Sequence, residues 1–437
     1  MNKLLMLWIR RFQAYAFTLL CTTALVIGTS LLAPAGQTQT EPARSANSFV
    51  DSIGVNTHLY YDNSVYYQNY GDIIKPKLLA LGIHHIRDGA VINNNGYYDR
   101  LKELGNLGIS TSLSADPRGV TVQQAVDIVK RLGNAVEAIE GPNEYDHSGD
   151  GNWVNTVCTY VQQLYQAIKG DSATATLPVV GPSFTSEAAH KAVGDLSAAI
   201  DYDNMHNYYA GRNPGTGGWG SYGYGSLAWN VQVAQKQSSF KPVLSTETGY
   251  NNAVNTTGST GIPEAVAGKY IPRLFLEQFN YGIPRTWSYE LIDAYNNSNA
   301  RDSNFGLLRN DGSEKPAYLA LKNLLGLLND PGSDFKQATL DYSLSGDTTN
   351  LHHTLLQKCD GKFYLILWQE VPSFDPQQQT ELFVPDLSVT LTLNTVVSQA
   401  ATYQPNNSIT PTAQYTNPQQ LSLNVPDYPL VVELVPA

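Results

Sequence analysis

Two glutamates stand just past the ends of apolar runs that are typical of buried strands. The run 136–139 stops at a Gly-Pro pair and is followed by Asn143 and Glu144, and the run 242–246 is followed directly by Glu247. In β/α proteins the carboxyl ends of the strands carry the catalytic groups. Two carboxylates facing one cavity can hydrolyse a glycosidic bond, one as acid and the other as nucleophile or base. The pattern therefore predicts glycoside hydrolysis, with Glu144 and Glu247 as the catalytic pair.

Other acidic residues compete for these two roles. Glu140 precedes Glu144 by four residues, and we expect it to face outward, whereas Glu290 lies inside a later apolar run and is the strongest rival. A distance of ~5–5.5 Å between the catalytic carboxyl groups would indicate a retaining enzyme, and ~6.5–9.5 Å an inverting one. The acid must keep a proton near neutral pH, so we expect its pKa to be raised, while the other carboxylate must be ionised.

Donors that would hold Glu247 ionised are expected from other strand ends. Arg87 follows an apolar run on the second predicted strand, and a guanidinium there can pair with Glu247. Tyr208 can donate its hydroxyl to the same carboxylate, and His206, two residues earlier, alternates onto the same face of its strand. A purely structural ion pair is the alternative for Arg87, and a satisfied core histidine is the alternative for His206.

Aromatic residues indicate the kind of ligand. Trp287 is placed to floor a cleft, His58 stands in a tyrosine-rich loop, and Trp219 lies in the glycine-rich segment 211–230. Such a segment can close over a ligand, with core packing as the alternative. Flat apolar faces beside neutral hydrogen-bonding groups suit an uncharged polyhydroxyl ligand. The aromatic residues therefore predict a carbohydrate-binding cleft.

The composition agrees with a carbohydrate partner and argues against nucleic acid. The 437 residues carry 27 Lys and Arg against 38 Asp and Glu, a net charge of −11, and 27 tyrosines against 12 phenylalanines. A nucleic-acid partner requires a basic footprint, which this chain lacks. The histidines are scattered without metal-ligand spacing, so neither a metal nor another cofactor is predicted. We expect a monomer with a carbohydrate substrate and no protein partner.

The first 35 residues have the pattern of an export signal. A basic start precedes a long apolar run, which ends in a small-residue stretch resembling a cleavage site. The sequence therefore predicts a signal peptide over 1–35 and a secreted or periplasmic protein, with an uncleaved membrane anchor as the alternative. Residues 36–48 are polar and contain proline, which favours a flexible linker.

From residue 49 onward short apolar runs alternate with helical runs, which is the βαβ signature. Eight strands are predicted, over residues 52–59, 84–87, 110–114, 136–139, 178–181, 202–208, 242–246 and 286–292. Eight helices follow them in turn, over residues 74–81, 97–104, 122–132, 152–168, 187–200, 227–237, 263–281 and 316–328. Eight such units predict an α/β fold, a (β/α)8 TIM barrel over 49–332, with a doubly wound sheet as the alternative.

Beyond the barrel the pattern changes to short alternating runs separated by turn residues. These runs cover residues 339–345, 351–357, 362–368, 388–393, 400–403, 421–425 and 430–435. They predict a C-terminal antiparallel β-sandwich over 333–437. Because this region has no cluster of His, Asp and Glu, we expect it to pack against the barrel; a glycan-binding role is the alternative.

The motifs resemble those of the clan A glycoside hydrolases, with family 39 preferred and families 5 and 30 also similar. Asn143-Glu144 resembles that clan's Asn-Glu pair after strand four, and Glu247 in the run Ser-Thr-Glu-Thr-Gly resembles its strand-seven nucleophile. The positions that match the clan's arginine, His-x-Tyr and tryptophan are Arg87, His206, Tyr208 and Trp287. The likeness spans the barrel, with the sandwich as a common appendage.

The resemblance implies a retaining hydrolase of O-glycosyl compounds that acts on a poly- or oligosaccharide. Glu247 would attack the anomeric carbon while Glu144 protonates the leaving oxygen, and Glu144 would then serve as base toward water. Asn143 would hydrogen-bond the sugar 2-hydroxyl. The expected substrate-binding residues are Asn143, Arg87, His206, Tyr208, Trp287, His58 and Trp219. The alternative is a non-catalytic glycan-binding or adhesion protein on the same scaffold, which would not need both glutamates in register.

Overall fold

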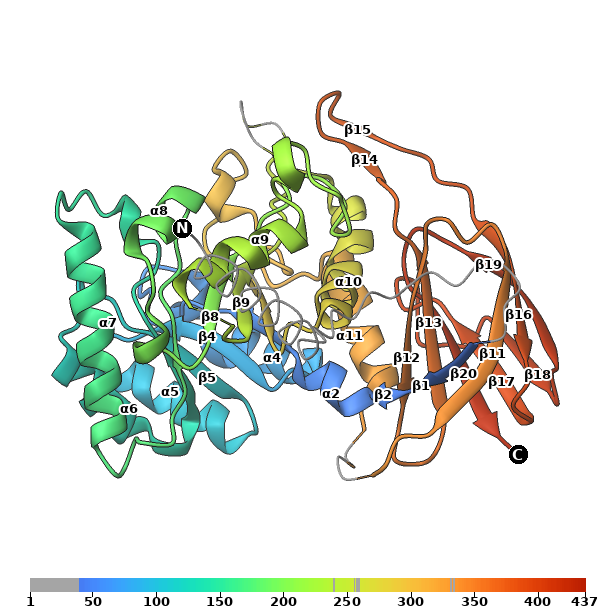
Figure 1. Ribbon diagram of the computed structural model, residues 1–437, viewed down its shortest axis with the longest axis horizontal. Helices are drawn as coiled ribbons and strands as arrows, with labels where there is room; N and C mark the ends of the chain where they lie inside the picture. The colour runs from blue at the N-terminus through green and yellow to red at the C-terminus, as the bar shows by residue number, and fades with distance from the viewer. Residues whose placement is uncertain (1–38, 239, 255, 257–259, 331, 333–334) are drawn as a thin grey trace, which may run out of the picture. The chain divides into compact units, whose positions relative to one another are not determined.

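The structure is a computed structural model that describes residues 39–238, 240–254, 256, 260–330, 332 and 335–437. It contains a β/α barrel followed by antiparallel sheets (Figure 1). The predicted signal peptide over 1–35 lies outside the described residues. Within the described part, no helix combines the length and the apolar character that crossing a membrane requires.

Eight parallel strands of the described chain form the barrel. They are β3 (Ile53–Asn56), β4 (His85–Gly89), β5 (Ser110–Ser114), β6 (Val136–Glu140), β7 (Val179–Val180), β8 (Asp203–His206), β9 (Val243–Thr248) and β10 (Thr286–Ser288). Neighbours pair in the order β7-β6-β5-β4-β3-β10-β9-β8, and a bridge between Val180 and Tyr202 links the two outer strands. Each predicted strand overlaps one of these strands, so the predicted TIM barrel is confirmed.

Helices connect the successive strands. They are α4 (Lys75–Leu81), α5 (Asn95–Asn106), α6 (Val122–Leu132), α7 (Trp153–Gly170), α8 (Glu187–Val193), α9 (Leu227–Ala234), α10 (Glu264–Tyr281) and α11 (Pro316–Leu328), with the shorter α2 (Ala46–Asp51) and α3 (Val65–Gln68). A capping box between Thr121 and Gln124 begins α6. Gly82 and Gly282 end α4 and α10 in the left-handed conformation that favours glycine.

Two sheets form the predicted sandwich, which the structure confirms. The four-stranded sheet has the order β1-β11-β16-β19, and the six-stranded sheet has the order β18-β17-β20-β13-β12-β2. A separate hairpin joins β14 to β15. The strands are β1 (Gln39–Pro42), β2 (Arg44–Ser45), β11 (Thr339–Gly346), β12 (Leu351–Gln357), β13 (Phe363–Gln369), β14 (Phe374–Asp375), β15 (Thr380–Glu381), β16 (Leu387–Leu393), β17 (Val397–Tyr403), β18 (Ala413–Thr416), β19 (Gln420–Val425) and β20 (Leu430–Pro436).

The segment predicted to be a flexible linker over 36–48 takes part in the sandwich instead. β1 pairs antiparallel with β11, β2 pairs parallel with β12, and α2 follows directly. Each sheet edge offers unpaired backbone N–H and C=O groups, and this segment satisfies them. Its polar, proline-containing sequence is therefore that of an edge strand, and the linker prediction is wrong from residue 39 onward.

The six-stranded sheet packs on the barrel through one of its two faces. Along β13, Phe363, Leu365 and Leu367 belong to the core between the two sheets. The alternating residues Tyr364 and Ile366 belong to the core of the barrel and its helices. A strand buried on both faces reads as a continuous apolar run, as β13 does. The expectation that the sandwich packs against the barrel is confirmed.

Candidate active site

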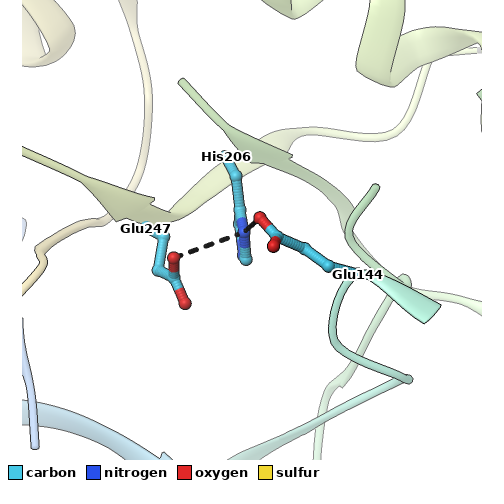
Figure 2. Close-up of side chains that lie close together, drawn as sticks. All are labelled: Glu144, His206 and Glu247. Carbon is cyan, nitrogen blue, oxygen red and sulfur yellow. Dashed lines mark hydrogen bonds and ion pairs between the residues drawn. The ribbon is translucent and has the colours of Figure 1, made fainter. Parts of the chain in front are cut away.

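The turn after β6 places Glu144 at the rim of the barrel. The backbone N–H of Glu144 donates to the carbonyl of Ser183 at 3.1 Å, and Asn143 forms a bridge with the same residue. Glu144 has a φ of 44°, in the left-handed region that residues other than glycine seldom adopt. This turn brings the carboxylate to His206, whose Nδ1 lies 2.7 Å from Glu144 Oε1 (Figure 2).

Glu247 lies near the end of β9 and receives hydrogen bonds from Arg87 of β4 and from Tyr208, two residues past β8. Arg87 Nη1 donates to Glu247 Oε1 at 2.9 Å, and the hydroxyl of Tyr208 donates to Oε2 at 2.9 Å. Nδ1 of His206 lies 3.5 Å from the same Oε2. Because both oxygens have donors, one of them a guanidinium, the position of the carboxylate is fixed.

The two predicted catalytic carboxylates face each other across a short gap. One oxygen of Glu144, one oxygen of Glu247 and a ring nitrogen of His206 all lie within 4.8 Å of one another. Figure 2 shows the three side chains converging from separate segments of the chain. The nearest oxygens of the two carboxylates are therefore no farther apart than the ~5–5.5 Å typical of a nucleophile and an acid acting on one bond, and closer than the ~6.5–9.5 Å that leaves room for a water.

Arg87 joins this pair to a buried polar layer beneath it. Its Nε and Nη2 donate to the two oxygens of Glu140, each at 2.7 Å, and Nη2 also donates to Asn143 Oδ1 at 2.7 Å. Glu140 is fully buried inside the barrel, so the expectation that it faces outward is wrong. Arg87 neutralises its charge, and Glu140 therefore serves as the partner of the arginine. Arg87 is both a structural ion pair and a donor to Glu247.

Hydrogen bonds beneath His206 establish which of its ring nitrogens carries a proton. The amide nitrogen of Asn204 donates two hydrogen bonds, at 3.0 and 3.1 Å, so its Oδ1 is the acceptor for the Thr246 hydroxyl at 2.7 Å. The Thr246 oxygen then accepts from His206 Nε2–H at 3.1 Å. With Nε2 protonated, the contact between His206 Nδ1 and Glu144 holds one proton that the two groups share.

The charges around this pair favour the proton on the imidazole. Burial lowers the pKa of His206, but the negative charges of Glu247 and Glu144 outweigh burial, and the pKa is raised. Burial raises the pKa of Glu144, but the hydrogen bond and charge of His206, together with the charge of Arg87, bring it below its usual range. The expectation of a raised pKa for this acid is therefore wrong, because the neighbouring histidine holds the proton.

Two cavities meet at Glu247. The larger, about 810 Å³, extends from Glu144 and Tyr208 to the segment 211–230, and the smaller, about 500 Å³, lies against Arg87 and Asp88. Both are within the ~300–1,000 Å³ that ligand pockets usually span. Their linings share His58, Tyr61, Asn143 and Glu247. Glu247 therefore faces both cavities.

Aromatic side chains line the larger cavity. Trp219, predicted to bind the ligand, is one of them, and Tyr224 and Trp229 stand beside it. The Arg212 guanidinium lies 4.5 Å from the centre of a Trp219 ring, and Tyr224 meets Trp219 edge-on at 5.6 Å. This packing holds the indole of Trp219 as one wall of the cavity, as a flat sugar-binding surface requires.

His58 lines both cavities, as predicted, and the rival Glu290 lies behind it. His58 stacks on Tyr61 with ring centres 4.4 Å apart, and burial lowers its pKa to about 4, so the imidazole is neutral. Glu290 accepts a hydrogen bond from Tyr66 at 3.0 Å, and burial raises its pKa well above the usual range. Glu290 lines neither cavity, which excludes it from direct contact with a ligand held there.

Trp287 does not line the site, so the prediction that it floors the cleft is wrong. It is 1% exposed and packs with Ala138, Val180 and Leu244 inside the barrel. The chain reaches the rim at Tyr289, which directly follows β10, two residues past Trp287, and lines the larger cavity. The strand alternation that pointed to Trp287 applies equally to Tyr289. The sequence could therefore have predicted Tyr289, because it points to the same side as Trp287 but lies nearer the rim of the barrel.

Glu144, His206 and Glu247 are also the kind of donor set that divalent metals accept, since each offers one ligand atom within the 4.8 Å cluster. However, the Arg87 guanidinium already contacts one oxygen of Glu247, and the Tyr208 hydroxyl contacts the other. A metal ion there would face the positive charge of Arg87. The partners of Glu247 therefore fit a free carboxylate better than a metal ligand.

Comparison with known proteins shows a shared fold. No family model and no curated protein matches the sequence. A family 39 glycoside hydrolase from the gut symbiont Bacteroides cellulosilyticus WH2 has a TM-score of 0.56 and 16% identity, covering 90% of this chain and 82% of its own. A 4-O-α-L-rhamnosyl-β-D-glucuronidase from Fusarium oxysporum 12S has a TM-score of 0.54 and 13% identity, covering 91% and 97%. An endo-β-1,6-glucanase has a TM-score of 0.50 and 11% identity, covering 92% and 95%. The chain thus shares its fold with glycoside hydrolases, including a family 39 enzyme.

Proposed function

We propose that the protein is a glycoside hydrolase that cleaves O-glycosidic bonds with retention of configuration. The observation that carries this proposal is the pair Glu144 and Glu247, which face one cavity with carboxylate oxygens within 4.8 Å. Their settings differ. Glu247 accepts hydrogen bonds from a guanidinium and a hydroxyl, whereas Glu144 is paired with the imidazole that carries a mobile proton. Two carboxylates in such unequal settings are what a nucleophile and an acid/base require.

In the first step Glu247 attacks the anomeric carbon, and the bond from that carbon to the leaving oxygen breaks. The proton held between His206 Nδ1 and Glu144 Oε1 passes through the Glu144 carboxyl to the leaving oxygen. The new ester bond consumes the negative charge of Glu247. His206 then loses one of the two anions that raise its pKa.

In the second step a water molecule attacks the anomeric carbon and displaces Glu247. Glu144, now a carboxylate beside a neutral imidazole, takes the proton of that water and returns it to the shared position. Asn143 would bind the sugar. This is supported by its place in the lining of both cavities and by its Oδ1, which Arg87 occupies, so that its amide N–H groups are left to donate. These hydrogens can donate to the sugar 2-hydroxyl, the contact that the clan A resemblance implies.

The two cavities support a poly- or oligosaccharide as the substrate. Glu144 lines the larger cavity and not the smaller, so the leaving part of the substrate would occupy the larger one. The part that becomes attached to Glu247 would lie on the side of Arg87 and the smaller cavity. Each cavity exceeds one sugar ring, which favours a chain bound on both sides of the broken bond.

We also propose that the protein acts outside the cytoplasm as a monomer. Support comes from the basic and then apolar pattern of residues 1–35. Mass spectrometry of protein recovered from the medium and the periplasm should find chains that begin near residue 36, and light scattering should give the mass of one chain. Full-length protein retained with the membranes would instead indicate an uncleaved anchor.

A screen of the purified protein against xylans, mannans and β-glucans tests the proposed activity. Reducing ends should appear with at least one polysaccharide, and proton NMR at early times should show a product with the anomeric configuration of the bond that was cleaved. Initial formation of the opposite anomer would contradict the retaining mechanism while leaving the glycosidase activity. Binding without any product would favour the non-catalytic glycan-binding alternative.

A further inference from the structure

The segment 211–226, which runs from the barrel rim after β8 to the start of α9, forms an aromatic wall of the larger cavity. Trp219, Tyr224 and Gly225 of this segment line the cavity directly. The segment has no regular strand or helix except one short turn of 3-10 helix at its tip. Its position must therefore be fixed by contacts with other parts of the molecule.

The base of this segment is bound by a carboxylate from the sandwich. Glu370, the residue after β13, accepts hydrogen bonds on its Oε1 from Asn213 Nδ2 at 2.7 Å and from the backbone N–H of Gly215 at 2.8 Å. A Cβ built on Gly215 would lie 2.4 Å from the Cγ of Glu370, so only glycine permits this approach. The close fit indicates that the loop and the carboxylate are matched in shape.

Glu370 is itself held rigidly. Arg273 of α10 donates from Nε to Glu370 Oε2 at 2.9 Å, and its Nη2 lies 2.7 Å from Oε1. The indole N–H of Trp368 donates to Oε2 at 3.0 Å. The Glu370 side chain is 1% exposed and that of Arg273 is fully buried. A buried carboxylate with this many donors has little freedom to move, which makes it a firm anchor.

The residues that line the cavity lie only a few positions along the chain from those that Glu370 binds. Trp219 follows Gly215 by four residues, and its backbone N–H donates to the carbonyl of Tyr224 at 2.9 Å. Arg212, next to Asn213, stacks on the Trp219 ring, and its carbonyl accepts from the Tyr250 hydroxyl at 2.8 Å. The residues on either side of the Glu370 contacts thus hold the two aromatic rings of the wall.

We propose that Glu370 is a positioning residue for the leaving-group side of the active site, through which the β-sandwich holds the segment 211–226 as a sugar-binding wall. What the wall binds rests on the proposed function, whereas the anchoring does not. Glu370 would not touch the substrate. The sandwich would then contribute to substrate binding from outside the cavity, by fixing Trp219 and Tyr224.

Two variants separate the loop from the anchor without removing a charge. Asn213→Ala deletes one hydrogen bond to Glu370 and leaves the pair with Arg273 intact, and Gly215→Ala forces the loop away by its added Cβ. Asn323→Ala is the matched control. Asn323 of α11 also donates one side-chain hydrogen bond between the barrel and the sandwich, to the carbonyl of Pro405 at 2.8 Å, and it forms no hydrogen bond with the segment 211–226 among the described residues.

Hydrogen–deuterium exchange of peptides covering 211–226 tests the anchoring without any substrate. Exchange should be about tenfold faster in Asn213→Ala and Gly215→Ala, as expected when a hydrogen bond to a buried charge is lost. The Asn323→Ala protein should exchange like the wild type over this segment. Unchanged exchange in both loop variants, or equally fast exchange in the control, would overturn the proposal.

Kinetics then tests the role in binding, with the sugar that the polysaccharide screen identifies. For a hexasaccharide, the loop variants should raise KM about five- to tenfold with kcat within about twofold, the loss expected of one weakened aromatic contact. For the glycosyl fluoride of the same sugar, which places no sugar on the leaving side, KM should stay within about twofold of wild type. Equal changes for both substrates would overturn the positioning role. A wild-type protein that hydrolyses nothing would refute the proposed function and leave the exchange result to decide the anchoring.

Discussion

Two charge clusters of this protein contain the same kinds of charged residue, and only one of them lines the two cavities of the active site. The active-site cluster consists of Arg87, Glu140, Glu144, His206 and Glu247. The interface cluster, between α10 and the sandwich, consists of Arg273, Glu277, His352, Trp368 and Glu370. Each pairs an arginine with a buried glutamate and places a histidine beside a second carboxylate. Residue type alone therefore does not distinguish a reactive site from an anchor.

The difference lies in what remains free to meet a ligand. In the interface cluster Glu277 accepts from Trp368 at 3.1 Å and lies 2.6 Å from His352. The Glu370 side chain is 1% exposed and that of Glu277 is 13% exposed, and neither lines the two cavities of the active site. In the active-site cluster the Glu144 side chain is 32% exposed and lines the larger cavity. Burial and the charge of Glu370 raise the pKa of Glu277, so a shifted pKa occurs in the interface cluster too. Access, more than electrostatics, marks the site.

Removing either catalytic carboxylate should have the largest effect on activity. Glu247→Gln removes the nucleophile and Glu144→Gln removes the acid, so each should lower kcat by roughly 10³-fold or more while the midpoint of thermal unfolding changes by only a few degrees. Initial rates and thermal denaturation of the purified variants measure both quantities. Glu290→Gln is the control, since Glu290 is buried outside the cavities and should retain kcat within about fivefold. A fully active Glu144→Gln protein would refute the assignment.

Breaking the interface cluster should affect stability and leave kcat nearly unchanged. Arg273→Met leaves Glu370 buried without its guanidinium, which should cost about 3–5 kcal/mol of unfolding free energy. Urea denaturation measures the loss. The double variant Arg273→Met/Glu370→Leu removes both charges and should recover part of that loss, since an apolar pair can replace a buried ion pair. Recovery should be incomplete because Asn213, Gly215 and Trp368 then lack the acceptor that Glu370 provides. A loss of less than about 1 kcal/mol in Arg273→Met would contradict this prediction, because it would show that the Arg273–Glu370 pair contributes no more to stability than an exposed ion pair.

His206 and His352 should affect the pH dependence of stability in the same direction, but only one of them should affect the pH dependence of activity. Burial lowers the pKa of His352, but its hydrogen bond and charge interaction with Glu277 raise it overall, and the pKa of His206 is likewise raised. A histidine whose pKa is higher in the folded state than in the unfolded state, where it is about 6.5, stabilises the fold. This stabilisation is complete at pH values below the unfolded-state pKa and is lost as the pH rises through the folded-state pKa. In both His352→Gln and His206→Gln, the unfolding free energy should therefore decrease less than in the wild type as the pH rises above about 6.5.

Only His206→Gln should change the pH dependence of kcat/KM. Without the imidazole, the proton that Glu144 delivers is held by the carboxyl alone, whose pKa is lower than that of the pair. The alkaline limb of the profile should therefore move to lower pH, whereas in His352→Gln it should stay where it is in the wild type. An alkaline limb that moves in both variants would show that the interface cluster also governs the proton of the site.

The barrel and most of the site were predictable because their signals are local. Each strand is a short apolar run that ends at turn residues, and the end of the run places Glu144, Glu247 or Arg87 at the rim. The alternation along one strand likewise places His206 and Tyr208 toward the same cavity. None of these inferences requires knowing which distant segment is the neighbour.

The predictions that failed depend on distant partners. Glu140 turns inward because Arg87, on another strand, supplies the charge that makes burial possible. Residues 39–45 form strands because β11 and β12, far along the chain, offer free edges. The lowered pKa of Glu144 depends on His206, whose own charge depends on Glu247. Such pairings appear only once the fold has brought the segments together.

The smallest expected effect tests which aromatic residue belongs to the site and which to the core. Trp287 fills the barrel interior against Gly54, where an added Cβ would lie 2.4 Å from the indole. Its buried N–H has no hydrogen-bond acceptor among the described residues, so Trp287→Phe also removes an unsatisfied donor. The variant should lose only about 1–2 kcal/mol of unfolding free energy and keep KM within about twofold. Tyr289→Ala should raise KM by roughly tenfold, because Tyr289 lines the larger cavity. Urea denaturation and steady-state kinetics of the two variants measure these effects. A large rise in KM for Trp287→Phe with little change for Tyr289→Ala would show that Trp287, and not Tyr289, contacts the substrate.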